Sequence, residues 1–481
     1  MDVDEFRRRG KEMVDMIADY YSTIRERRVL SDVQPGYLRS LLPFTAPNEP
    51  EKWEDIVKDI ERAIMPGITH WLHPQFHAYF PLGFSFPSLL ADMLCNGVHT
   101  IGFSWITSPA ATELEMIVLD WLGIALKLPS EFLLQNEHRE SQKGGGVIQG
   151  TASEATLVAM LAARHEAVKK LQLELPELKD HEAQGKLIAY GSDQANSSFD
   201  KAAIIAAVKL RKLPTDENFS LRGEALETVI KEDVQAGLHP FYLLATLGTT
   251  SSCAFDNLLE LGPICQKFGL WMHIDAAYAG SAFICPEYRP LLNGVEYAES
   301  FNFNPHKWML TSFDCSCLWL KRRAAIINAL SVDPVVLQNA ASDSGLVVDY
   351  RDWEIPLGRR FRSLKLWFVL RLYGITGLQQ FIRKQIQLAK KFETLIRSSD
   401  LFEFPVKPVL GLVCFRLKGS NDLNKKYLKA LNDSGTIYMI GTELGDQYVL
   451  RMCIGSTQTK ESDIDITWDI VKSIANNTVG K

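Results

Sequence analysis

The 481-residue chain is 46% hydrophobic and 23% charged, which is typical of a globular protein with a large apolar core. Its formal net charge of -6 argues against nucleic acid or an anionic membrane surface as a partner. The N-terminus lacks a signal-type apolar core, no run is long enough to span a bilayer, and the eight cysteines form no CxxC pair. These features predict a cytoplasmic protein with reduced thiols and no metal site.

Residues 1–85 are predicted to be helical. Val14, Ile17, Tyr21 and Ile24 recur at three- and four-residue spacing, which gives one apolar face. The segment contains no strand-like run, so it has little with which to build a core of its own. We expect it to pack against something else, such as a second subunit.

Residues 86–356 have the pattern of an α/β domain. Helical stretches alternate with short apolar runs, which predicts a mainly parallel sheet covered on both faces. The strand-like runs are "LIAY", "FYLLAT", "LWMHID", "SFNF" and "CLWL". Residues 357–481 contain a long helical stretch and two more strand-like runs, and they are predicted to form a smaller α+β domain.

The first candidate site is the glycine-rich stretch "GGGVIQGTASEATLVAM". Its glycines lead into Thr151, Ala152 and Ser153, where a helix is expected to begin. Free N–H groups and the positive end of the helix dipole bind anions at such a start, and the two hydroxyls add donors. Taken alone, the stretch suits a phosphate, but Ser153 could equally be no more than a helix N-cap.

Two further candidates follow strand-like runs. "HIDAAYAG" places Asp275 at the carboxyl end of a strand, where a carboxylate can pair with a protonated ring nitrogen. "SFNFNPHKWM" places Lys307 after a turn, and a lysine in an apolar or cationic neighbourhood can form a Schiff base. Taken singly, the aspartate could cap a helix or bind a turn, and the lysine could lie at the surface.

Together, the three features predict a site for pyridoxal 5'-phosphate. The glycine-rich helix start would hold the phosphate. Asp275 would keep the pyridine nitrogen protonated, and Lys307 would bind the aldehyde covalently.

Matching motifs extend over nearly the whole chain, among them "EFRRRGKEMVD", "SPAATELE", "ATLGTT", "FNFNPHKW" and "PLGRRFRSLKLWFVLR". In these the sequence resembles the group II pyridoxal-phosphate-dependent aromatic L-amino-acid decarboxylases. The family includes DOPA decarboxylase and the insect 3,4-dihydroxyphenylacetaldehyde synthases. The resemblance implies a fold-type I enzyme, similar in fold to aspartate aminotransferase. It also implies a homodimer clasped by residues 1–85 and an aromatic amino-acid substrate, with L-DOPA expected first.

The resemblance also implies roles for individual residues. Those expected to hold the cofactor are Thr151, Ala152, Ser153, Asn196, Thr250, Asp275, Ala277, Asn304 and Lys307. Those expected to line the substrate side are Tyr79, Phe80, Pro81 and Leu82, with Ile101 and Phe103 entering from the neighbouring subunit. The candidate catalytic residues are Lys307, Asn196, Asp275, His306, Val336 and Tyr79.

The chain departs from the decarboxylases at three of these positions. Asn196 stands where they carry a histidine that stacks on the cofactor ring, and an amide neither stacks in that way nor acts as an acid near neutral pH. Val336 stands where they carry a loop tyrosine, which is the best candidate for protonating the substrate Cα. Leu82 replaces a hydroxyl residue that faces the catechol in DOPA decarboxylase, which weakens the expectation of DOPA as substrate.

These departures predict the aryl acetaldehyde as the product, with the amine, or a mixture of both, as the alternative. Rapid protonation at Cα after loss of CO2 gives the amine. Slow protonation lets dioxygen react instead, which gives an aryl acetaldehyde, ammonia and peroxide. Asn196 and Val336 favour the aldehyde, whereas the order Tyr79-Phe80 is that of the decarboxylases. An aminotransferase and a catalytically idle binding protein are less consistent with the sequence, because no second keto-acid site is evident and the cofactor residues are retained.

Overall fold

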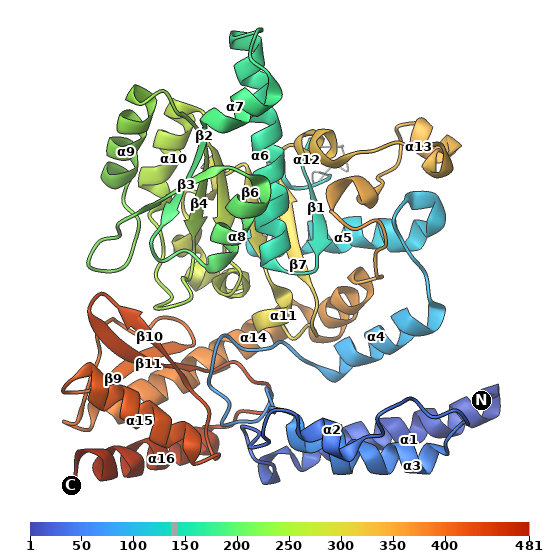
Figure 1. The fold of residues 1–481 in the computed structure, drawn as a ribbon, viewed down its shortest axis with the longest axis vertical. Helices are drawn as coiled ribbons and strands as arrows, with labels where there is room; N and C mark the ends of the chain where they lie inside the picture. Colours follow the sequence, from blue (N-terminus) through green and yellow to red (C-terminus); the bar gives the residue numbers. More distant parts are fainter. Residues whose placement is uncertain (136–142, 481) are drawn as a thin grey trace. The chain divides into compact units, whose positions relative to one another are not determined.

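A computed structural model describes residues 1–135 and 143–480 and divides the chain into two compact units (Figure 1). The first unit combines Met1–Pro81, Leu388–Lys407 and Val413–Lys481, and the second combines Leu82–Gln387 and Pro408–Leu412. The sequence-based segments 1–85, 86–356 and 357–481 divide the chain differently, because the N-terminal helices share a unit with most of the C-terminal segment.

A seven-stranded sheet forms the centre of the second unit. Its strands, in spatial order, are β1 (Gly145–Gln149), β7 (Ser316–Leu320), β6 (Ser300–Phe303), β5 (Trp271–Asp275), β4 (His239–Thr246), β2 (Leu187–Ser192) and β3 (Lys209–Leu213). Strand β7 is antiparallel to both of its neighbours, and the other pairs are parallel. The mainly parallel α/β sheet predicted from the alternating pattern is confirmed.

Two strands of this sheet were not predicted, and each lacks the expected signal. β1 is fully buried, but two of its five residues are glycines, so it lacks the continuous apolar run of a buried strand. β3, "KLRKL", is an edge strand that buries only its last residue, so its polar composition resembles a loop.

Helices cover both faces of the sheet. On one face, α6 (Ala152–Glu174) and α8 (Ser197–Ala206) bury alanine, valine and leucine side chains against β2, β4 and β5. On the other side lie α9 (Gly223–Gln235) and α10 (Leu258–Phe268) (Figure 1). The remaining helices of this unit are α4 (Phe86–Val98), α5 (Pro109–Leu126), α7 (Asp180–Lys186), α11 (Pro305–Trp308), α12 (Arg323–Leu330) and α13 (Ala340–Asp343). Helix α14 (Ser363–Arg397) is kinked at Gly374, where φ is 63°.

The first unit is built on a four-stranded sheet. The strand order is β10 (Ile440–Leu444), β11 (Gln447–Cys453), β9 (Leu412–Leu417) and β8 (Phe402–Glu403), and α15 (Asn421–Asp433) and α16 (Glu461–Val479) pack on it. The N-terminal part adds α1 (Val3–Ser22), α2 (Tyr37–Leu41) and α3 (Trp53–Asp59), which continues into a π-helical turn.

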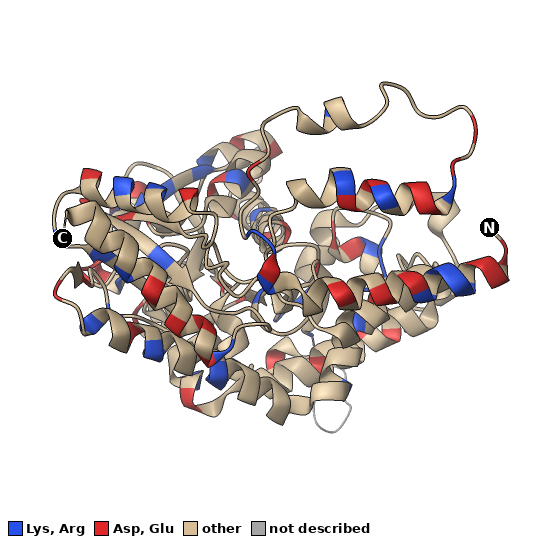
Figure 2. Ribbon diagram, turned by 90° about the horizontal axis from the view of Figure 1, so that it is seen from below, with Lys and Arg blue, Asp and Glu red and all other residues tan. Residues whose placement is uncertain are grey.

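The N-terminal part packs on this unit through a small apolar cluster. Val29, Phe76 and Ala78 are buried against Tyr438 and Ile440 of the C-terminal segment. Helix α1, by contrast, is charged along its length (Figure 2). None of its residues, all of them described, is more than partly buried. Among the helices described, none is both long and apolar enough to cross a membrane.

Candidate active site

The predicted site residues of the second unit meet at one edge of the large sheet. Strands β1, β2, β4, β5 and β6 all run in the same direction, so their carboxyl ends lie together. Asp275 is the last residue of β5, and the segments that follow the other ends carry Thr151, Asn196, Thr250 and Lys307. Topology therefore brings together residues that are more than 150 positions apart in the chain.

The glycine-rich stretch leads directly into helix α6. Thr151 is the N-cap, and its hydroxyl accepts a hydrogen bond from the Glu154 N–H at 3.3 Å. The N-cap role that Ser153 could have had therefore belongs to Thr151, and the exposed Ser153 hydroxyl lies in the first turn. A Cβ at Gly150 would lie 3.0 Å from Glu154 Oε2 and 3.3 Å from Asp314 Oδ2, so a larger residue in this close turn would have to displace these carboxylates.

Asp275 is buried at the end of β5. Its Oδ1 accepts a hydrogen bond from the Ala277 N–H at 3.0 Å, so the carboxylate does bind a backbone turn, as one of its alternative interpretations held. Burial raises the pKa of Asp275, and the positive charge of Lys307 opposes that rise. The two side chains are thus close enough to interact electrostatically.

The segment from Asn304 to Lys307 forms a short helical turn beside β6. The Lys307 N–H donates to the Asn304 carbonyl at 2.9 Å, and the buried Asn304 Oδ1 has no hydrogen-bond partner among the described residues. The His306 Nδ1 accepts a hydrogen bond from the Cys315 N–H at 2.8 Å, which places the proton of the neutral ring on Nε2. Burial lowers the pKa of His306 to about 3, so the ring stays neutral at physiological pH.

Asn196 has a structural role that the sequence did not reveal. It is the N-cap of helix α8, and its Oδ1 accepts a hydrogen bond from the Ser198 N–H at 2.9 Å. Its Nδ2 donates to Thr250 Oγ1, also at 2.9 Å, so the two predicted cofactor residues are in direct contact.

The predicted substrate residues are divided between the two units. Tyr79, Phe80 and Pro81 end the first unit, and Leu82 begins the second. Tyr79 has a φ of 59°, and its hydroxyl lies 3.2 Å from that of Tyr438. The roles of Tyr79, Phe80 and Pro81 remain predictions.

The other predicted positions lie on loops of the second unit. Ile101 and Phe103 follow helix α4, and the Ile101 side chain is half exposed. Val336 lies in a short turn and is 87% exposed. The contribution of these residues to the site therefore remains an expectation that rests on the family resemblance.

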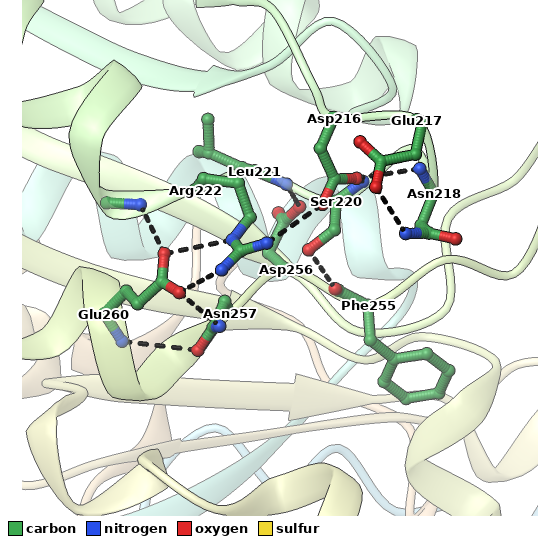
Figure 3. Close-up of polar contacts among 11 residues, drawn as sticks. Asp216, Glu217, Asn218, Ser220, Leu221, Arg222, Phe255, Asp256, Asn257 and Glu260 are labelled. Carbon is green, nitrogen blue, oxygen red and sulfur yellow. Dashed lines mark hydrogen bonds and ion pairs between the residues drawn. The ribbon is translucent and has the colours of Figure 1, made fainter.

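Two buried or partly buried interactions near the site were not predicted. Asp314 forms an ion pair with Arg362 at 3.0 Å beside the Gly150 turn. Asp256, which is buried, accepts hydrogen bonds from the N–H groups of Leu221 at 2.8 Å (Figure 3) and Thr246 at 2.7 Å. Neither interaction could be predicted from a local motif, because the partners lie on different segments of the chain.

These residues fit pyridoxal phosphate. The start of α6 offers N–H groups and hydroxyls to a phosphate, and Asn304, whose side-chain Nδ2 can donate, follows β6 at the same end of the sheet. A buried carboxylate and a lysine that interact with each other supply the partners for a ring nitrogen and an aldehyde.

Comparisons with known proteins agree with this fit. Residues 35–418 match the pyridoxal-dependent decarboxylase conserved domain. The chain is 55% identical to the aromatic-L-amino-acid decarboxylase of Mus musculus over 479 residues, covering 100% of this chain and 99% of the relative. Among solved structures, Catharanthus roseus tryptophan decarboxylase in complex with L-tryptophan is 44% identical with a TM-score of 0.92, and 99% of each chain is covered. Rhodiola rosea 4-hydroxyphenylacetaldehyde synthase is 38% identical with a TM-score of 0.91, again with 99% of each chain covered.

Proposed function

The chain belongs to the pyridoxal-dependent decarboxylases, and we propose that its substrate is an aromatic L-amino acid. It is accordingly a fold-type I, pyridoxal-phosphate-dependent carboxy-lyase. The aromatic substrate is supported by the names of its relatives, which act on aromatic amino acids. L-DOPA is the first substrate to test.

The proposed cofactor site is the sheet edge described above. The phosphate is held by Thr151, Ala152, Ser153 and Asn304. The ring is held by Asn196, Thr250, Asp275 and Ala277. Lys307 forms the covalent link. The observation that best supports this arrangement is that the segments carrying these residues meet at the carboxyl ends of the strands β1, β2, β4, β5 and β6, which run in the same direction.

Each polar group then has a chemical task. Bound pyridoxal phosphate supplies an electron sink for the bond that breaks at the substrate Cα. Asp275 holds the proton on the ring nitrogen. His306 is neutral and carries its proton on Nε2, so that atom can act as a hydrogen-bond donor. Tyr79, Phe80, Pro81 and Leu82, with Ile101 and Phe103 of a partner subunit, are proposed to line the substrate side.

The Lys307→Ala variant tests the cofactor assignment. Purified with added pyridoxal phosphate, it should lose the visible absorption of the covalently bound cofactor and all turnover. Borohydride reduction of the wild type fixes the cofactor to its lysine, and peptide mapping should find the pyridoxyl group on Lys307. A pyridoxyl group on another lysine, still present in the variant, would refute the assignment.

The amine is the product that the decarboxylase relatives favour. An aryl acetaldehyde is a second candidate, and two observations favour it. Asn196 engages Thr250 and the start of α8 with an amide that cannot act as an acid, and Val336 offers no proton at all. In that reaction the amino acid, O2 and water give the aldehyde, CO2, ammonia and H2O2.

One assay separates the two products. L-DOPA is incubated with the enzyme in air, and the amine, aldehyde, CO2 and peroxide are quantified. Amine with no peroxide would establish the plain decarboxylase, whereas equimolar aldehyde and peroxide would establish the oxidative route.

If aldehyde forms, Asn196→His and Val336→Tyr should shift the product towards the amine. General acid catalysis contributes about 10²- to 10⁴-fold, so restoring a proton donor should outcompete the oxygen reaction. Val335→Tyr places a phenol one residue away and serves as the control for Val336→Tyr. An unchanged ratio in both variants would show that these positions do not control the product.

A homodimer is also proposed. Helix α1 has no buried side chains, counting only the residues described, and α4 exposes Phe86, Leu90, Met93, Leu94 and Val98. Apolar side chains in such numbers are typical of a surface that is covered by another chain. Sedimentation at assay concentration should give a dimer, and a fully active monomer would contradict the proposal.

A further inference from the structure

A chain of buried polar side chains lies on the same face of the sheet as Asp275. The Trp271 Nε1 lies 2.8 Å from Ser300 Oγ, which lies 2.7 Å from His273 Nδ1. The His273 Nε2 lies 2.9 Å from Asn302 Oδ1. All three of His273, Ser300 and Asn302 are fully buried.

The direction of this chain follows from its last acceptor. The Asn302 Oδ1 can only accept, so His273 carries its proton on Nε2 and donates it to that oxygen. The unprotonated Nδ1 of the neutral ring then accepts from Ser300 Oγ, which itself accepts from Trp271. Burial lowers the pKa of His273 to about 3, so the ring is neutral and this direction is kept throughout the physiological range.

With its oxygen held by His273, the Asn302 amide turns its nitrogen away from the histidine. The Asn302 Nδ2 is buried and has no hydrogen-bond partner within the described parts of the chain. Asn302 is the register partner of Asp275 on the parallel strand β6. In-register side chains on adjacent strands leave the same face about 5 Å apart, so the amide lies beside the carboxylate.

The opposite neighbour of Asp275 has the same property. Thr246 is its register partner on β4. The Thr246 hydroxyl is likewise buried and has no partner among residues 1–135 and 143–480. Buried polar groups are nearly always paired, so two unpaired ones on either side of a single carboxylate require an explanation.

We propose that Thr246 and Asn302 are positioning residues for Asp275, and that His273 orients the Asn302 amide for this purpose. Neither donor is hydrogen-bonded to Asp275 in the described structure, so each acts on the carboxylate as a neighbouring dipole that favours its ionised form, which a protonated ring nitrogen requires as its partner. The inference rests on the proposed role of Asp275 in holding the cofactor. It adds three residues that act through Asp275 and do not themselves touch the cofactor.

The test is the affinity of the apoenzyme for pyridoxal phosphate, measured by quenching of tryptophan fluorescence. His273→Phe keeps the ring volume but loses the donor, and Asn302→Leu keeps the side-chain size but loses the amide. Each should weaken cofactor binding about tenfold, because the Asn302 dipole beside the carboxylate is lost or turned away. His273→Gln retains a donor for Asn302 and should bind within about threefold of the wild type.

A matched pair of threonine variants controls for a loss of binding that is caused by misfolding. Thr246→Val removes no hydrogen bond present in the structure, so it should fold, yet it should weaken cofactor binding severalfold. Thr112→Val deletes another buried hydroxyl with no partner among the described residues, in helix α5, and should leave the affinity unchanged.

Two outcomes would overturn the inference by different routes. If Asp275→Asn weakens binding but His273→Phe, Asn302→Leu and Thr246→Val do not, the positioning role fails while the role of Asp275 stands. If Asp275→Asn binds the cofactor as the wild type does, the proposed role of Asp275 fails and the positioning role fails with it. Equal losses in His273→Gln and His273→Phe would show that ring packing, and not the donor, is what matters.

Discussion

Asp256 is expected to make the stability of the enzyme fall as the pH rises. The carboxyl group is buried. It accepts from the N–H of Leu221, which lies on a loop (Figure 3), and from the N–H of Thr246 at the end of β4. Burial raises its pKa from an ordinary value of 3.8 to about 7, against the two backbone N–H groups that it accepts from. The charges of Asp193 and Asp216 add to the rise.

The sign follows from the order of the two pKa values. Between about pH 4 and pH 7 the unfolded chain has already lost this proton and the folded chain still binds it, so each rise in pH favours unfolding. The stabilisation is fully present below the unfolded value and is lost as the pH rises through about 7. The interval between 3.8 and about 7 corresponds to about 4 kcal/mol.

The Asp256→Asn variant isolates this contribution. An amide is neutral at every pH, so the variant should gain about 4 kcal/mol relative to the wild type between about pH 4 and pH 8. Placing the NH2 group of the asparagine against a backbone N–H costs a constant amount. This changes the unfolding free energy of the variant at every pH equally, so the change of the difference with pH is unaffected. All other titrating groups cancel in the comparison.

The assay is urea unfolding of the holoenzyme at a series of pH values and one protein concentration, followed by tryptophan fluorescence. Asp120→Asn is the matched control, because Asp120 also accepts from two backbone N–H groups, those of Leu134 and Gln135, but is less buried. Its pH dependence should be weaker. A difference between the wild type and Asp256→Asn that stays constant over this range would refute the reasoning.

Two further predictions concern packing and buried charge. Gly191→Ala would place a Cβ 2.4 Å from Phe199 Cε1, so it should destabilise the fold by about 1–3 kcal/mol. Gly185→Ala has open space around the new Cβ and should not destabilise it. The midpoints of urea unfolding of the two variants and the wild type provide the comparison. Arg359→Met leaves two buried carboxylates, Glu115 at 2.7 Å and Glu354, without their shared cation, which should cost about 3–5 kcal/mol in the same assay. A stable Arg359→Met protein would show that these carboxylates take up protons instead.

The sequence alone determined the features that depend on local pattern. Alternation of apolar runs with helical stretches predicted the mainly parallel sheet, because each pattern reflects one buried face. The glycine-rich stretch, "HIDAAYAG" and "NPHK" predicted a cofactor site at strand ends. A helix start binds anions, a carboxylate pairs with a cation and a lysine forms an imine, and each of these properties can be recognised from a short segment. The residues that these motifs contain do meet at one sheet edge.

Only the tertiary structure decided which residues stand beside them. Asp275 has Thr246 on one side and Asn302 on the other because of strand order and register, and neither is encoded within a single segment. The helix-capping role of Asn196 and its contact with Thr250 likewise depend on where β2 and β4 end. Side chains that are far apart in the chain become neighbours only when the sheet is assembled. The physical reason is that these parallel strands are joined by long crossover connections, so no local turn fixes which strands pair or in what register.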